Sequence, residues 1–174
     1  MKWIVIVILA LVALVAIVWI AGSLMPREHR ASSRITLKQP PDSIWPVVSD
    51  LGAVTKWFPE ITLSERVGAG PPERWRQKMG NKFDMQFDVT ERTPPTRFVT
   101  RIVTDKGAVF GGTWTYEIAP IAGGSTVTVT EDGWVGPPPF RVMSRLMGQH
   151  STMDTYLRAL SRKFGETTAP VHMP

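Results

Sequence analysis

A histidine and an aspartate near the end of the chain have the residue types and the spacing of an acid–base pair. His150 and Asp154 stand four residues apart in a segment with helical periodicity, so both side chains would lie on one face of a helix. A carboxylate that orients an imidazole is the arrangement that a general base needs. His150 also falls in an apolar stripe, one turn from Met147 and Met153, so the pattern fits a single buried histidine equally. The residues themselves leave both interpretations open.

Glu131 is a further candidate for acid–base chemistry. It shares its alternation with Val127 and Val129 in a segment of strand period, which turns the three side chains to one inner face. An inward carboxyl group there would be a candidate acid or a polar handle for a ligand hydroxyl. The alternative is that Glu131, Asp132 and Gly133 only form a turn at the end of the strand.

The sequence gives no support for a metal or cofactor site. His29, His150 and His172 lie in three separate regions without ligand spacing, and the chain has no cysteine. The pair Gly111-Gly112 opens a strand rather than a helix, so it is not a phosphate loop. A Gly-x-Ser-x-Gly nucleophile elbow is also missing from the sequence. We therefore expect neither a metal nor a cofactor.

The charge balance is mildly basic. The chain has 20 Lys and Arg against 15 Asp and Glu, a net charge of +5, and no dense basic block. This composition argues against a dedicated nucleic-acid binder and fits a domain that lies near anionic lipid headgroups. The absence of cysteine suits either side of a membrane, so it does not identify the compartment.

The N-terminal run from Trp3 to Met25 contains no charged residue and is long enough to cross a hydrocarbon core of about 30 Å as one helix. A signal peptide normally has a shorter apolar region of about 7 to 15 residues. We therefore expect an uncleaved transmembrane anchor over residues 1–26, with cleavage near Ala21-Gly22-Ser23 as the alternative. More basic residues follow the run than precede it, which favours a single-pass protein with a cytoplasmic domain.

The remainder of the chain has the periodicities of one α+β domain over residues 32–165, after a short linker at 27–31 and before a flexible tail at 166–174. The longest helical pattern, Phe140 to Phe164, comes last. It follows a first strand, two short helical pieces and a series of strands with period two. The short helices are expected at 42–48 and 53–57, and the strands at 33–39, 61–67, 73–79, 82–90, 97–103, 113–119 and 126–135. This order predicts a curved antiparallel sheet of about six to seven strands wrapped around a long C-terminal helix.

Four segments carry a family resemblance: PPDSIWPVVSDLGAVTKWFP (40–59), GGTWTYEIAP (111–120), STVTVTEDG (125–133) and MDTYLRAL (153–160). They resemble the START-like, or SRPBCC, superfamily, which includes polyketide cyclase/dehydrase-like proteins and has the helix-grip fold. The resemblance covers about residues 32–164 and implies that fold. It does not choose a function, because the superfamily carries lipid and hormone binders, cyclases and oxygenase domains on one scaffold.

A sheet that wraps around a helix leaves room for a cavity between the two. We expect an apolar lining made of aromatic and methionine side chains with His150 among them, although ordinary core is the alternative for most of these residues: Trp75, Phe83, Met85, Phe87, Phe98, Trp114, Tyr116, Met143, Met147, His150 and Met153. The favoured function is membrane-anchored binding of a hydrophobic small molecule or lipid. Two alternatives remain: a polyketide cyclase/dehydrase-like enzyme with His150 as general base, and a membrane-docked adaptor for a protein partner.

Overall fold

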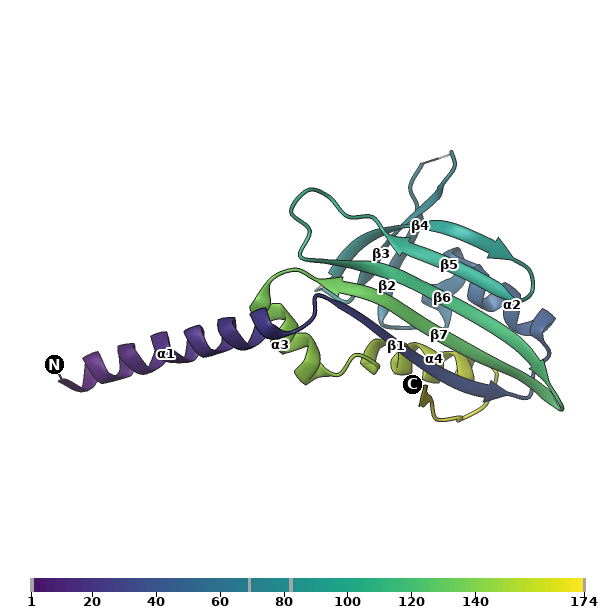
Figure 1. Ribbon diagram of the computed structural model, residues 1–174. Coiled ribbons are helices and arrows are strands. Elements are labelled where there is room, and N and C mark those ends of the chain that lie inside the picture. The colour runs from purple at the N-terminus through teal and green to yellow at the C-terminus, as the bar shows by residue number, and fades with distance from the viewer. Residues whose placement is uncertain (1, 69, 82, 174) are drawn as a thin grey trace.

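The computed structural model describes residues 2–68, 70–81 and 83–173 of the 174-residue chain. The described residues leave out Met1, Ala69, Lys82 and Pro174. Met1 is the first residue of the expected anchor, Lys82 is the first residue of the strand expected at 82–90, and Pro174 is the last residue of the expected tail. The elements follow in the order α1 (Lys2–Leu24), β1 (Glu28–Leu37), α2 (Pro41–Ser49), the 3-10 helix η1 (Leu51–Lys56), β2 (Ile61–Arg66), β3 (Glu73–Met79), β4 (Phe83–Thr93), β5 (Arg97–Ile102), β6 (Phe110–Ile121), β7 (Gly124–Val135), α3 (Pro138–Met147), α4 (Ser151–Lys163) and β8 (Val171–Met173) (Figure 1).

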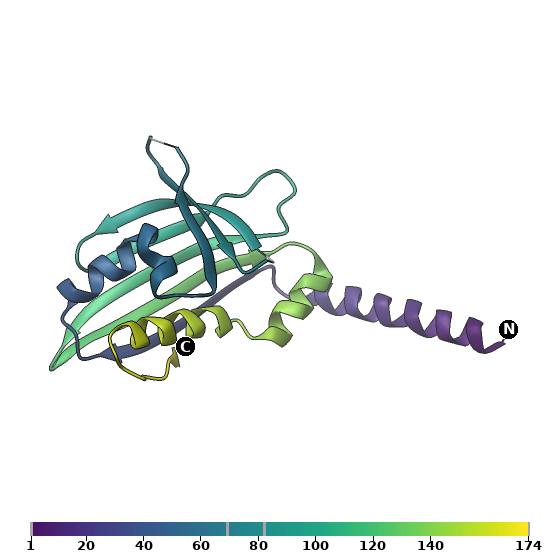
Figure 2. The ribbon, with the colours of Figure 1, turned by 180° about the vertical axis from the view of Figure 1, so that it is seen from behind.

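One curved antiparallel sheet dominates the domain, with the strand order β2-β3-β4-β5-β6-β7-β1-β8. Consecutive strands from β2 to β7 are neighbours because turn sequences such as Gly80-Asn81 and Gly123-Gly124 join them as hairpins. The helices α2, η1 and α4 lie on the concave side of the sheet (Figure 2). The expected α+β helix-grip fold is confirmed, with eight strands among the described residues instead of six or seven.

The core lies between the concave face and α4. Along β1, the inward positions Ala31, Ser33, Ile35 and Leu37 are buried, and the residues that alternate with them are more exposed, as the period of a strand requires. On α4, Met153, Leu157 and Leu160 recur at helical spacing and are fully buried. These two apolar faces hold α4 against the sheet.

The C-terminal helical pattern forms two helices, so the expectation of one helix from Phe140 to Phe164 is wrong. α3 ends at Met147, and the next residue, Gly148, has a φ of 82°, a conformation that side chains with a Cβ disfavour. A second helix then starts at Ser151. The apolar periodicity runs through this break because both halves are amphipathic, but α3 contacts α1 whereas α4 contacts β1.

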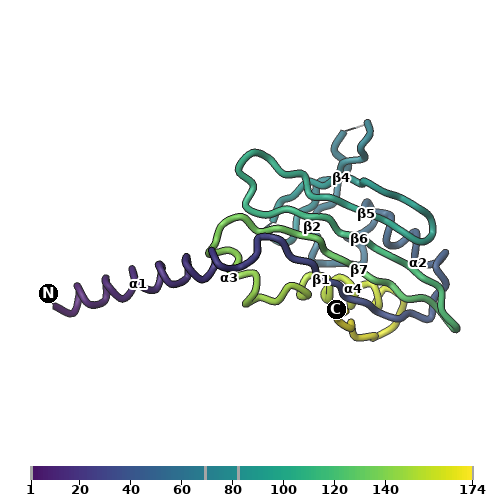
Figure 3. Tube along the Cα trace, viewed as in Figure 1, coloured from purple at the N-terminus to yellow at the C-terminus, as the bar shows by residue number. Residues whose placement is uncertain are grey.

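Residues 28–31 of the expected linker and residues 171–173 of the expected tail belong to the sheet. β1 begins at Glu28, which pairs with Trp134, and Arg30 donates a hydrogen bond to Asp132. At the other end, β8 pairs with β1, and Met173 faces Ser32. The tube in Figure 3 shows the chain returning past α4 to lie beside β1. Period two in strands as short as β8 is too weak a signal to predict them from sequence.

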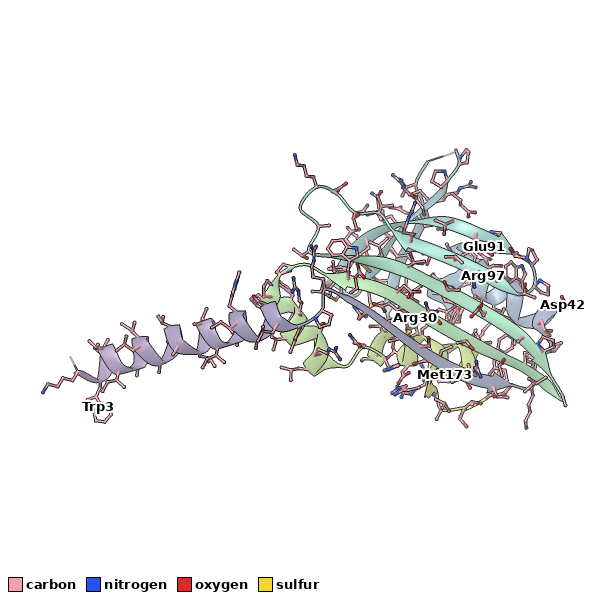
Figure 4. All side chains as sticks on the ribbon, in the orientation of Figure 1. Trp3, Arg30, Asp42, Glu91, Arg97 and Met173 are labelled. Carbon is pink, nitrogen blue, oxygen red and sulfur yellow. The ribbon has the colours of Figure 1, made fainter. Side chains whose placement is uncertain are left out.

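α1 extends away from the domain, with Trp3 at its far end (Figure 4). Its apolar side chains are exposed over most of its length, and Gly22 near its end is buried against the rest of the chain. The helix is long and apolar enough to cross a membrane, with a mean hydropathy of 3.4 over its most apolar window. Length and composition of this kind fit a membrane span or a signal sequence.

Candidate functional site

Aromatic side chains fill much of the space between α4 and the sheet, where the sequence predicts a cavity. The ring of Tyr156 on α4 lies 5.4 Å from the ring of Tyr116 and 6.2 Å from that of Trp114. Phe98 packs 5.6 Å from Tyr116 and is fully buried, as is Met153. Burial raises the pKa of both tyrosines, so their hydroxyl groups stay protonated at neutral pH. Phe98, Tyr116 and Met153 therefore belong to the core.

Apart from His150, the other residues expected to line the cavity fall into two groups. Four are half-buried on the inner face of the sheet: Trp75, Met85, Phe87 and Trp114. Three are exposed, by 46%, 48% and 70%: Phe83, Met143 and Met147. The two methionines leave the concave side because the break at Gly148 carries α3 toward α1.

A groove of about 400 Å³ opens to solvent between α2 and η1 on one side and β3 and β4 on the other. This volume lies within the range of small-molecule sites, about 300 to 1,000 Å³. Among the residues that the sequence predicts as cavity lining, Trp75 is the one that contributes. The lining residues are Trp45, Pro46, Ser49, Asp50, Leu51, Glu73, Trp75 and Arg92.

Hydrogen bonds fix the polar side chains of this groove. Arg92 donates through Nη1 to the Ser49 carbonyl at 2.9 Å and through Nη2 to Glu73 Oε2 at 3.2 Å. Its guanidinium carbon lies 5.0 Å from the ring centroid of Phe98, close enough for a cation–π contact. The indole N–H of Trp75 donates to Glu73 Oε1 at 2.7 Å. The groove thus combines two indole rings with a paired positive charge.

His150 and Asp154 are linked through a third residue, Ser33, which the sequence analysis misses. His150 is the N-cap residue of α4, and its Nδ1 lies 3.2 Å from Ser33 Oγ. Ser33 Oγ in turn donates to Asp154 Oδ1 at 2.7 Å. A hydroxyl group has one proton, so the Nδ1 of His150 must donate to Ser33, and in the neutral form of the imidazole the lone pair lies on Nε2. The signal for Ser33 is its inward position on β1, between Ala31 and Ile35.

His172 completes this cluster from β8. Its ring stacks on that of His150 at 3.9 Å, and its Nε2 lies 2.9 Å from Asp154 Oδ2. Burial by itself would raise the pKa of Asp154, but the hydrogen bonds from His172 and Ser33 and the charges of His172 and Arg158 hold that pKa below its ordinary value. Asp154 is therefore an ionised, buried carboxylate at neutral pH. The sequence gives no signal for His172, because that residue lies in the segment expected to be a tail.

Glu131 points to the inner face of β7, as its alternation predicts, and the strand continues past it to Val135. Trp114 donates its indole N–H to Glu131 Oε2 at 2.9 Å, and His29 Nε2 lies 3.1 Å from Oε1. Gly133 leaves room for the His29 ring, since a Cβ at that position would meet the imidazole. Both oxygens of the carboxylate have partners, so Glu131 holds the start of β1 against β7.

A known protein family also matches the sequence of this domain. The profile of the family described as "Polyketide cyclase / dehydrase and lipid transport" matches residues 28–165. The chain belongs to this family. The match starts at the first residue of β1 and ends just after α4, so it covers β1 to β7 and leaves α1 and β8 outside. A search of curated proteins found no match to the chain.

Solved structures with the same fold come from several organisms. A conserved protein from Geobacillus kaustophilus shares 15% identity at a TM-score of 0.65, covering 83% of this chain and all 100% of its own. A START superfamily protein from Mycobacterium smegmatis shares 19% identity at a TM-score of 0.64, over 78% and 96% of the two chains. A truncated norcoclaurine synthase from Thalictrum flavum shares 13% identity at a TM-score of 0.63, over 79% and 93%. At these identities the similarity establishes the fold, and the family indicates a START/polyketide cyclase-like domain for hydrophobic ligands.

Proposed function

We propose that the protein is a membrane-anchored binder of a hydrophobic small molecule or lipid, and that the groove between α2 and β3 is part of its site. The observation that carries the proposal is the lining of this groove by Trp45 and Trp75 beside the paired side chain of Arg92. Indole rings offer large apolar surfaces whose burial stabilises a complex by about 25 cal/mol per Å². Arg92 supplies hydrogen-bond donors for one polar end of an amphipathic ligand.

The groove borders the core beneath the sheet. The ring of Trp45 lies 6.4 Å from that of Phe98 in an edge-to-face arrangement, and Arg92 covers the same ring. Rotation of either side chain would expose Phe98 to the groove. The proposed ligand site therefore extends from the groove toward the space between the sheet and α4, where the sequence analysis expects it.

The anchor in this proposal is α1. Its side chains from Trp3 to Ile20 are apolar and largely exposed, and exposing so much apolar surface to water would cost a large free energy. A bilayer removes that cost because its hydrocarbon core matches the length of the helix. We propose a cytoplasmic domain because more basic residues follow α1 than precede it.

A photoreactive palmitate tests the proposal in cells that express the full chain. After illumination and trypsin digestion, the tryptic peptide 39–56, which holds Trp45 and Leu51 of the groove, should carry the label. The α1 peptide serves as an internal control for contact with bulk lipid. Labelling of 39–56 should fall sharply in Trp75→Ala and persist in Trp3→Ala, which removes a tryptophan outside the groove. Labelling of α1 alone in the unmodified chain contradicts a fatty ligand in the groove.

The hydrogen-bonded series Asp154–Ser33–His150 favours a second candidate, an enzyme that resembles polyketide cyclases. A buried carboxylate fixes the serine, the serine fixes the imidazole, and Nε2 of His150 keeps a lone pair able to accept a proton. Heptane-2,6-dione, which closes to 3-methylcyclohex-2-enone by an intramolecular aldol condensation, is a simple probe of such a base. Turnover that His150→Ala abolishes would support the enzyme, whereas no closure above the buffer rate would count against it.

A further inference from the structure

α1 and α3 meet in a close joint. The backbone of Gly22 lies against the carbonyl of Pro138 so tightly that no Cβ would fit between them. Arg141 donates from Nη1 to the carbonyls of Gly22 at 3.3 Å and Met25 at 3.1 Å, and from Nε to that of Val135 at 3.0 Å. The last carbonyls of a helix lack partners within the helix. Arg141 supplies these partners for α1 and ties it to the end of β7.

The outer face of α3 is apolar and exposed. No residue of this helix is buried. Its four large apolar side chains lie on one side, because their positions 140, 143, 146 and 147 follow the spacing of one helix face. Arg141 and Arg145 project from the opposite side of the helix. The apolar residues are exposed by 46%, 48%, 83% and 70%, in the order Phe140, Met143, Leu146 and Met147.

The apolar surface continues from α3 onto Val109 and onto the first residues of β4 and β6. Gly136, which precedes α3, donates to the carbonyl of Val109, and the side chain of Val109 is 40% exposed. Phe110 packs edge-on against Phe83 at 6.5 Å, and Phe83 is 46% exposed. Exposed apolar residues thus gather at the end of the domain from which α1 emerges.

The orientation of α3 relates this surface to α1. Both ribbon views show α3 running across the domain end of α1 rather than along it (Figures 1 and 2). The contact at Gly22 places the start of α3 level with the last turn of α1, which contains no charged residue. A helix with one apolar face that crosses the end of a membrane span lies in the plane of the bilayer interface.

We propose that α3 is a second membrane contact, which lays its apolar face into the headgroup and acyl boundary of the bilayer beside α1. The inference rests on the proposed anchor and adds to it a fixed orientation of the domain. The joint at Arg141 makes α1 and α3 turn together, so the domain cannot swing freely on a flexible tether. α2 lies at the end of the domain away from α1 in Figure 1. The groove beside it is therefore held open toward the aqueous side.

Site-specific fluorescence in the full chain tests this proposal, because the chain has no native cysteine. A polarity-sensitive nitrobenzoxadiazole label is placed at Leu146→Cys on α3, with Val12→Cys on α1 and Arg162→Cys on α4 as controls. All three native side chains are exposed, so the substitutions leave the core intact. The chains are reconstituted into vesicles of phosphatidylcholine with a minority of phosphatidylglycerol. Lipids with a spin label near the top of the acyl chain act as shallow quenchers, and lipids with the label near the end of the chain act as deep quenchers.

We expect the shallow label to quench most of the Leu146→Cys emission, at a depth of about 5 to 10 Å. The deep label should quench Val12→Cys, which lies at the middle of α1, and neither label should quench Arg162→Cys. Quenching at Val12→Cys without quenching at Leu146→Cys would overturn the role of α3 and leave the anchor standing. Absence of quenching at both positions would overturn the anchor and this inference together. Cross-linking between two Leu146→Cys chains in the absence of quenching would identify a second copy, not lipid, as the occupant.

Discussion

Replacing Ser33 by alanine should destabilise the domain far more than the same change one residue away. Ser33 is fully buried, and its hydroxyl group donates to the ionised carboxylate of Asp154 at 2.7 Å. Hydrogen bonds to charged groups contribute about 1.5 to 3 kcal/mol. Asp154 keeps His172 as a partner in the variant, so we expect a loss of about 2 to 3 kcal/mol in the free energy of unfolding.

Ser32→Ala is the matched control, because Ser32 is the adjacent serine of β1 on the outer face of the sheet. Its hydroxyl group pairs with Thr130 at 2.9 Å in a neutral, half-buried hydrogen bond, so we expect a loss of about 0.5 to 1 kcal/mol. Urea unfolding of the full chain in detergent micelles, followed by tryptophan fluorescence, measures both variants. Equal losses for Ser32→Ala and Ser33→Ala would refute the assignment of Ser33 to a charged network.

The same network sets how stability responds to acid. The partners of Asp154 lower its pKa in the folded chain, so its ionised form stabilises the fold above the ordinary carboxyl range, and this stabilisation is lost as the pH falls through the lowered pKa. Urea unfolding at a series of acidic pH values should therefore show the deficit of Ser33→Ala shrinking. Met153→Ala should cost about 2 to 5 kcal/mol because Met153 is fully buried, whereas Met143→Ala on the exposed face of α3 should cost less than about 0.5 kcal/mol in the same assay. Gly22→Val should force α1 and α3 apart and increase tryptic cleavage at Arg141, and unchanged digestion would argue against a close joint.

Local patterns predict most of the fold. The strand expected at 73–79 has those bounds in the structure, since side chains that alternate between Gly- and Pro-rich turns identify a strand without knowledge of its partners. The helix break at Gly148 is different, because a single glycine is tolerated within many helices and the apolar stripe continues beyond it. Whether such a glycine ends a helix depends on tertiary contacts, here those of α3 with α1.

The candidate site was harder to predict. The inward position of Glu131 follows from its alternation, but its partner His29 lies in a segment that looks like a linker. His150 and Asp154 have the spacing of a direct pair, yet Ser33 connects them from a strand far away in the sequence. Hydrophobicity alone cannot separate a side chain that fills the interior from one that lines a cavity. Phe98 and Met153 are fully buried and fill the interior, and only the packing in the structure shows this.

Native mass spectrometry of the full chain, released from detergent micelles after gentle purification from membranes, tests the proposed binding most directly. A hydrophobic molecule in the groove predicts a stoichiometric adduct on the unmodified chain and on Trp3→Ala, with loss of the adduct in Trp75→Ala. Organic extraction of the same sample would then identify its chemical class. A bare protein mass, unchanged after incubation with a panel of phospholipids, fatty acids and sterols, would contradict the proposal that this domain binds a hydrophobic ligand.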